Sequence, residues 1–273
     1  MSRIPTSGKV VIPAILAMLS AVFLGGNLGG GGLDDILGQL NGVQQQQQAP
    51  AEDPGLDDAP DPDADLAAFM GVVLASTEDL WANIFGNAGQ QYRPAPLVMF
   101  SGSTQSACGG ANSRVGPHYC PPDQTIYIDL DFFRDLSSRF QAPGDFAQAY
   151  VLAHEVGHHI QNLLGISDEV RQLRQSRPND ANELSVRLEL QADCFAGIWA
   201  YSEFTQDFLE RGDIEEALGA ASAVGDDRIQ EMSTGMINPE TWTHGSSEQR
   251  IEWFKAGFDS GDPNICDTFG DDF

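Results

Sequence analysis

The sequence is poor in basic residues. Its 273 residues include 14 Lys and Arg against 40 Asp and Glu, which gives a net charge of −26 at pH 7. Proteins that bind nucleic acids or anionic membrane surfaces neutralise phosphates with clustered Lys and Arg. The composition therefore argues against a nucleic-acid partner and a polybasic membrane patch. It favours solubility but does not indicate a substrate.

The sequence also lacks any C-x-x-C pair, because its four cysteines lie at positions 108, 120, 194 and 266. A structural zinc ribbon, which requires such pairs, is therefore disfavoured. The even number of cysteines permits two disulfides, and four free thiols remain the alternative.

No Lys, Arg or His occurs between residues 10 and 92. The mostly apolar run over residues 10–24 follows Arg3 and Lys9 and predicts an N-terminal membrane segment over residues 1–24. We expect an uncleaved, single-pass anchor in a cell membrane with the remaining chain outside the cytoplasm. A cleaved signal peptide, followed by secretion, is the alternative. Gly, Gln and acidic residues dominate residues 25–65, which predicts a disordered linker.

A folded domain is expected over residues 66–273. Apolar spacing predicts a helix over residues 66–85, with five side chains facing inward: Phe69, Val72, Val73, Leu80 and Trp81. Further helices are expected over about 145–164, 182–202, 213–225 and 246–261, and strands over 95–100 and 125–130. Capping boxes are expected at two helix starts: Asp213 with Glu216, and Ser246 with Gln249. Few strands followed by many helices predict a mostly helical α+β fold with a small sheet.

The segment VLAHEVGHHIQNLLG carries the clearest chemical signal, a His-Glu-x-x-His pattern at residues 154–158. A spacing of four places His154 and His158 on one helix face, where two imidazoles can bind one ion. Zinc suits imidazole ligands, and a catalytic zinc keeps one position open for water. Glu155 lies beside the histidines, where it can take a proton from that water. The pattern predicts one catalytic Zn²⁺ ion, and Gly157 indicates close packing or substrate access.

The third protein ligand is expected from a later segment, because Gln161 and Leu164 do not fit the metzincin pattern. Glu189 and Asp193 lie four residues apart on the helix expected over 182–202. We expect Glu189 to bind the metal and Asp193 to accept a hydrogen bond from a zinc histidine. A solvated acidic pair is the alternative, but the neighbouring residues are mostly apolar, and buried acids rarely lack partners.

Two other histidines are interpreted as structural. His159 points about 100° away from His158 on the helix, so we expect it to pack or to form hydrogen bonds. His118 is expected to be a surface residue in a loop.

His244 lies just before the predicted helix that carries Arg250. A histidine or arginine near the cleft could stabilise the oxyanion that forms when water attacks a carbonyl, and a structural role remains open. Residues 125–130 are either an edge strand that pairs with an extended substrate or an ordinary core strand.

The chain resembles the bacterial family of "putative neutral zinc metallopeptidases" over about residues 65–273. The resemblance rests on motifs that occur in order: CPPDQTIYIDL, HEVGHHIQNLLG, LELQADCFAG, GDDRIQ, THGSSEQR and GFDSGDP. It implies a membrane-anchored, zincin-like (gluzincin-like) domain. The E-x-x-A-D and T-H-G patterns are also similar to those of membrane-bound prenyl-protein and stress-induced proteases. That match implies Glu189 as the third zinc ligand and His244 as a transition-state residue. Those enzymes have several membrane spans, so their handling of substrates within the membrane is not carried over.

The function expected from these residues is zinc-dependent hydrolysis of a peptide or protein substrate, with Glu155 as the general base. A zinc-containing binding or assembly module of the envelope, with weak or no hydrolysis, is the alternative. Another zinc hydrolase, such as an amidase or deformylase, is a third possibility. In an extracytoplasmic domain, we expect disulfides that join Cys108 to Cys120 and Cys194 to Cys266. The oligomeric state stays open.

Overall fold

The structure is a computed structural model that describes residues 62–112 and 116–270. The expected membrane segment over residues 1–24 lies outside these ranges, as does nearly all of the expected linker over 25–65. Among the described helices, none combines the length and apolar character needed to span a bilayer. The linker was expected to end at residue 65, but the first described helix already begins at Ala64.

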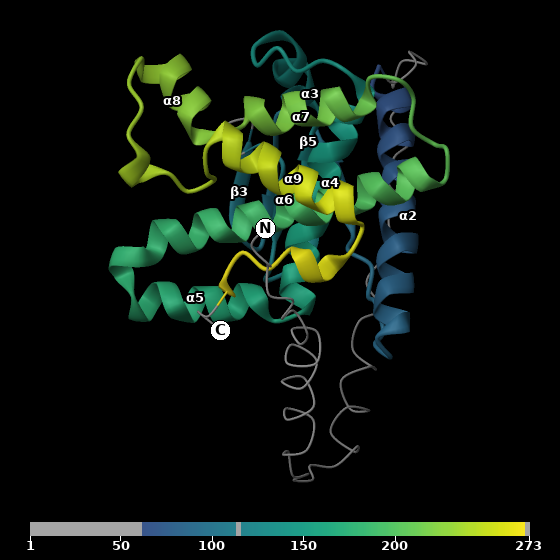
Figure 1. Cartoon of the computed structure of the whole chain (residues 1–273). Coiled ribbons are helices and arrows are strands. Elements are labelled where there is room, and N and C mark those ends of the chain that lie inside the picture. The colour runs from purple at the N-terminus through teal and green to yellow at the C-terminus, as the bar shows by residue number, and fades with distance from the viewer. Residues whose placement is uncertain (1–61, 113–115, 271–273) are drawn as a thin grey trace, which may run out of the picture. The chain divides into compact units, whose positions relative to one another are not determined.

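Helices make up most of the domain (Figure 1). The α-helices are α2 (Ala64–Asn87), α3 (Leu130–Ser138), α4 (Asp145–Leu163), α5 (Ile166–Ser176), α6 (Ala181–Thr205), α7 (Asp213–Ala223), α8 (Asp226–Thr234) and α9 (Ser247–Ser260). Short 3₁₀ helices are η1 (Pro178–Asp180), η2 (Pro239–Thr241) and η3 (Pro263–Ile265). The mostly helical α+β class is confirmed, although α3, α5 and α8 had not been predicted.

The strands form a three-stranded sheet and a separate hairpin. They are β1 (Leu97–Phe100), β2 (Ser103–Ser106), β3 (Gly109–Asn112), β4 (His118–Cys120) and β5 (Thr125–Asp129). The sheet order is β1-β5-β4, with β1 parallel and β4 antiparallel to β5, and β2 pairs with β3. Because β5 is central and buried along its length, the core-strand alternative holds and a substrate-pairing edge is excluded.

Several local predictions can be compared with the helix ends and faces. The capping box of Ser246 and Gln249 is present at the start of α9. The one expected at Asp213 is absent, because the carboxylate of Glu216 instead accepts a hydrogen bond from the backbone N–H of Phe146, in the first turn of α4. Val72 was expected to face inward but is 68% exposed.

The core surrounds α4, most of whose residues are buried. In Figure 1, α9 lies across the middle of the domain, against α6. Two glycines allow this close crossing: a Cβ on Gly197 would lie 2.0 Å from the carbonyl oxygen of Phe254, and one on Gly257 equally close to that of Cys194. On its other side, α6 packs against α4 at Gly157, whose missing Cβ would meet the backbone of Ala192 at 3.0 Å. The expected close packing at Gly157 is therefore present.

The two expected disulfides are confirmed. Cys108 pairs with Cys120 and ties the β2–β3 hairpin to β4. Cys194 pairs with Cys266 and ties the segment after η3 to α6. The second disulfide fixes the chain directly beside Asp193, one of the expected site residues.

Candidate metal centre

Helix α4 carries His154 and His158 on one face. The two imidazole rings lie one helical turn apart, with centroids separated by 4.8 Å and ring planes nearly perpendicular. Both side chains are largely buried, at 8% and 16% exposure, so their nitrogens point into a protected space with limited solvent access.

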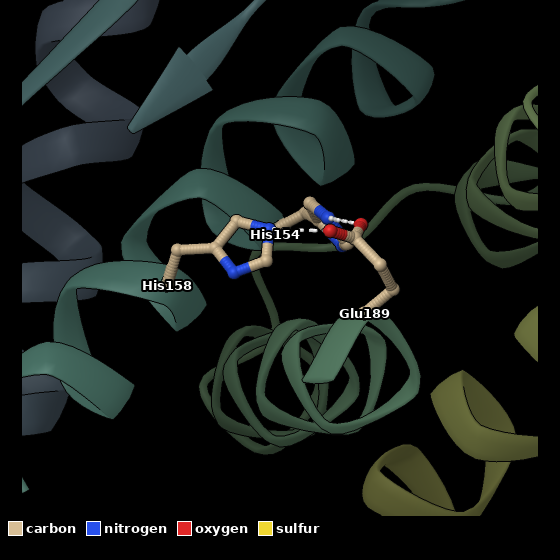
Figure 2. Close-up of side chains that lie close together, drawn as sticks. All are labelled: His154, His158 and Glu189. Carbon is tan, nitrogen blue, oxygen red and sulfur yellow. Dashed lines mark hydrogen bonds and ion pairs between the residues drawn. The ribbon is translucent and has the colours of Figure 1, made fainter. Parts of the chain in front are cut away.

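Helix α6 contributes Glu189 to the same space. Figure 2 shows its carboxylate facing the two histidines. One oxygen lies 3.2 Å from Nε2 of His154, and the other lies 3.5 Å from Nε2 of His158. The structure thus brings together the three residues that the sequence indicated as metal ligands. His154 on α4 and Glu189 on α6 are 35 positions apart in the chain.

These spacings fit a single zinc ion. Zinc binds nitrogen and oxygen at about 2.0–2.2 Å, and two ligands of a tetrahedron with such bonds lie about 3.3–3.6 Å apart. One ligand atom from each residue can be chosen so that all lie within 4.8 Å of one another. Two neutral imidazoles and one carboxylate would leave a fourth position for water or substrate.

Asp193 lies behind His154, as expected for a residue that orients a metal ligand. Its Oδ1 lies 2.8 Å from Nδ1 of His154. Because a carboxylate only accepts hydrogen bonds, Nδ1 is the donor, and the lone pair of Nε2 is available on the side of Glu189.

Arg250 and Tyr150 complete this buried network. The guanidinium of Arg250 donates to both carboxylate oxygens of Asp193, at 2.8 and 2.9 Å. The Tyr150 hydroxyl donates to Asp193 at 2.5 Å and accepts from Arg250 at 3.2 Å. Burial by itself would raise the pKa of Asp193, but Arg250 and His154 lower it to about 2. Asp193 is therefore an anion at neutral pH.

The carboxylates also control the protonation of the metal-free histidine pair. Burial opposes a charged imidazole, but Asp193 and Glu189 together raise the pKa of His154 to about 9. The pKa of Glu189 is held well below its usual value, against the effect of burial, by the two histidines. The site therefore favours a positive charge, supplied by a proton or by a cation.

Glu155 follows His154 on α4 and is buried. None of the residues in the described ranges forms a hydrogen bond with its carboxylate. Its charge raises the pKa of the neighbouring His158, although burial and Glu189 act more strongly on that group. Glu155 thus lies next to His154 in the chain and acts electrostatically on His158.

His244 lies in the loop between η2 and α9. Oδ2 of Asp226 accepts the backbone N–H groups of Thr243, His244 and Gly245, at 2.7, 2.6 and 3.1 Å. Oδ1 lies 3.2 Å from Nδ1 of the His244 ring, whose side chain is 51% exposed. This hydrogen bond, together with the charges of Glu189 and Asp226, raises the pKa of His244.

The loop of His244 rests on the helix that carries Glu189. A Cβ added to Gly245 would meet the side chains of Val186 and Leu190 on α6, at 3.2 and 3.3 Å. Among the described residues, His244 forms no hydrogen bond or ion pair with His154, His158 or Glu189, although the charge of Glu189 acts on its ring. Arg250 had been considered as an oxyanion-stabilising residue, but its guanidinium is buried against Asp193 and is not available for that role.

The remaining histidines differ in outcome. His159 is fully buried and bonds to the Tyr119 hydroxyl and the carbonyl of Arg93, so its structural role is confirmed. His118 was expected to be an exposed loop residue, but it begins β4 and stacks on Tyr127 with a centroid distance of 5.2 Å. Pairing in the sheet explains the difference.

Sequence reasoning missed two residues that support the ligands. Tyr150 precedes His154 by one turn of α4, and Gln161 follows His158 by three residues, with its Oε1 2.8 Å from Nδ1 of His158. Both lie at i−4 or i+3 from a ligand, which is the spacing of side chains that meet on one helix face. That spacing was the available signal.

Two histidines on one helix and a carboxylate from a second helix match the His₂Glu ligand set of zinc peptidases, and Glu155 follows the first histidine as in the His-Glu-x-x-His pattern. Comparison with known sequences agrees with this class. The profile of the family described as "Putative neutral zinc metallopeptidase" matches residues 3–269, and the chain belongs to that family. The family resemblance found in the sequence is confirmed.

Similar proteins occur in distant bacteria. The chain is 50% identical to "Uncharacterized protein YpfJ" of Escherichia coli (strain K12) over 271 residues, which cover 98% of this chain and 89% of that protein. It is also 50% identical over 189 residues to "Uncharacterized protein Rv2575" of Mycobacterium tuberculosis (strain ATCC 25618 / H37Rv). Those residues cover 65% of this chain and 63% of that protein. No solved structure shows significant similarity to the chain.

Proposed function

We propose that the protein is a zinc-dependent peptidase that hydrolyses peptide bonds in a peptide or protein substrate. The convergence of His154, His158 and Glu189 supports this proposal most directly, because their spacing fits one zinc ion with an open position. Glu155 adds a second argument, since a purely structural zinc site requires four protein ligands and no base.

In this proposal Glu155 moves the proton. Zinc held by the three ligands would lower the pKa of a bound water to about 7 and polarise the scissile carbonyl. The Glu155 carboxylate takes one proton from the attacking water as the new carbon–oxygen bond forms. It then gives that proton to the amide nitrogen as the carbon–nitrogen bond breaks, and a carboxylic acid and an amine leave.

His244 is proposed to act on the oxygen of the attacked carbonyl. Its hydrogen bond to Asp226 favours the protonated ring, in which Nε2 is a donor. A donor aimed at a developing oxyanion stabilises the transition state more than the substrate. The three backbone bonds to Asp226 tie this loop to the start of α8, and Gly245 of the same loop lies against α6, the helix that carries Glu189.

We propose that hydrolysis takes place outside the cytoplasm, on a chain anchored by its N-terminal segment. Both disulfides support this location, because such bonds persist in oxidising compartments. A chain released by signal cleavage would place the same domain in the same environment.

The experiment that tests this function compares the full chain with Glu155→Gln. Zinc content and cleavage of an unbiased peptide library are measured with and without chelator. Exposed Glu215 on α7 provides the matched control, Glu215→Gln. We expect one zinc per chain in all three proteins and a loss of about 10²–10⁴-fold in turnover for Glu155→Gln alone.

Two outcomes would count against the proposal. Cleavage that survives Glu155→Gln would refute the assignment of the base. A wild-type chain that binds one zinc but cleaves no peptide would favour the envelope binding or assembly module instead.

A further inference from the structure

A chain of buried amides lies behind His158. Oε1 of Gln161 lies 2.8 Å from Nδ1 of His158. Nε2 of the same amide donates to the carbonyl of Leu188 at 2.6 Å and to Oε1 of Gln191 at 3.1 Å. Nε2 of Gln191 donates in turn to the carbonyl of Cys266 at 2.9 Å. Both glutamines are buried, so water does not substitute for these partners.

The two backbone carbonyls fix the direction of every bond in this chain. A carbonyl oxygen only accepts, so the NH₂ group of Gln191 must face Cys266 and that of Gln161 must face Leu188. The remaining atom of the Gln161 amide, its oxygen, therefore faces His158. Rotating either amide by 180° would place its oxygen against a backbone carbonyl oxygen. Two acceptors would then face each other, and buried polar groups would lack partners.

This direction determines the tautomer of His158. An oxygen acceptor beside Nδ1 requires Nδ1 to carry the hydrogen, which leaves the lone pair on Nε2, 3.5 Å from Glu189. Asp193 imposes the same tautomer on His154 with a charged acceptor, whereas Gln161 does so with a neutral one. A neutral acceptor avoids adding a further carboxylate beside Glu155, Glu189 and Asp193.

We propose that Gln161 is the positioning residue of His158, holding its Nε2 lone pair toward the metal site. This inference rests on the proposed zinc site. Gln161 also joins α4 to α6 through Leu188, so an experiment must separate the positioning of His158 from the simple joining of two helices.

Two substitutions make that separation. Gln161→Met keeps a similar length but removes the acceptor and both donor bonds. Gln161→Glu keeps an oxygen acceptor for His158 and removes the two donor bonds that join the helices. Asn162→Ala is the matched control, because it removes a hydrogen bond to Tyr119 from the same helix without touching His158.

The measurement is the zinc dissociation constant of the full chain, by competition with a chelator. We expect Gln161→Met to weaken zinc binding about 10–100-fold, as is usual for residues that orient a metal ligand. Gln161→Glu and Asn162→Ala should stay within about threefold of wild type, on the same reasoning. If Gln161 only joins the helices, Gln161→Glu and Gln161→Met will weaken zinc binding equally, and the proposal is overturned.

A second readout reports the hydrogen bond itself. In ¹H–¹⁵N spectra of the zinc-loaded chain, the Nδ1–H resonance of His158 should be lost or exchange rapidly in Gln161→Met and move downfield in Gln161→Glu, while that of His154 stays in place. If Gln161→Met does not fold, the shift in Gln161→Glu carries the test, and an unmoved resonance overturns the proposal. A wild-type chain that binds no zinc would refute the proposed function instead, which keeps the two failures distinct.

Discussion

Removing Arg250 should destabilise the protein more than removing any exposed arginine. Arg250→Met would leave the Asp193 carboxylate buried, with its two guanidinium bonds lost. Breaking a buried ion pair from one side costs about 3–5 kcal/mol. The pKa shift of Asp193 gives a smaller value for this free-energy cost. Despite burial, Arg250 and His154 reduce this pKa from 3.8 to about 2, which at about 1.36 kcal/mol per unit corresponds to roughly 2 kcal/mol.

The sign of the pH dependence follows from the same shift. A carboxyl whose pKa is lower in the folded protein stabilises the fold above its unfolded value of 3.8, and this contribution is lost as the pH falls through about 2. At pH 7 it is fully present. In a domain of this size about 1 kcal/mol lowers the melting temperature by about 2–4 °C, so Arg250→Met should lower it by about 6–20 °C.

The assay is thermal unfolding of the metal-free chain at pH 7, at low and high salt. Arg134→Met is the control, because Arg134 is exposed and its ion pairs with Asp63 and Asp131 are screened by salt. The double variant of Arg250→Met and Asp193→Asn should lose less than the sum of its parts. A shift below about 2 °C for Arg250→Met, equal to that of the control, would refute the reasoning.

Three further predictions follow from the geometry. Gly257→Ala should cost about 1–3 kcal/mol in chemical unfolding, because its Cβ would lie 2.0 Å from the carbonyl oxygen of Cys194; unchanged stability would contradict the close crossing. Zinc must displace a proton from His154, whose pKa is about 9 in the metal-free chain, so zinc affinity should rise about tenfold per pH unit from 7 to 8. Calorimetry in buffers of different ionisation enthalpy checks this proton release, and its absence would disprove it. His244→Gln should lower turnover about 10²–10³-fold with zinc content unchanged, and Asp226→Asn should act in the same direction; a parallel loss of zinc would indicate misfolding instead.

Local sequence patterns were sufficient for features that depend on one helix. The four-residue spacing of His154 and His158 places them together in any α-helix, so this half of the metal site could be predicted directly. The capping box of Ser246 is equally local, since its bonds join residues three positions apart. The same holds for the orientation of His159 away from the site.

Predictions failed, or stayed open, where packing between elements overrides the local pattern. Residues 125–130 alternate as an edge or a core strand would, and only the pairing of β5 with β1 and β4 decides between them. Val72 fits the apolar helix stripe but faces away from the neighbouring helices. Glu216 has the spacing of a capping box but instead contacts the start of α4, 70 residues away in the chain.

The sequence alone determined the paired imidazoles, the adjacent Glu155 and the acidic residues Glu189 and Asp193, because helix periodicity fixes which side chains share a face. The tertiary structure decided that Glu189 reaches both imidazoles and that Arg250 is buried against Asp193. The crossing of α4, α6 and α9 sets these distances, and it depends on glycines and core side chains spread over a hundred residues. Periodicity within one element carries no information about such contacts.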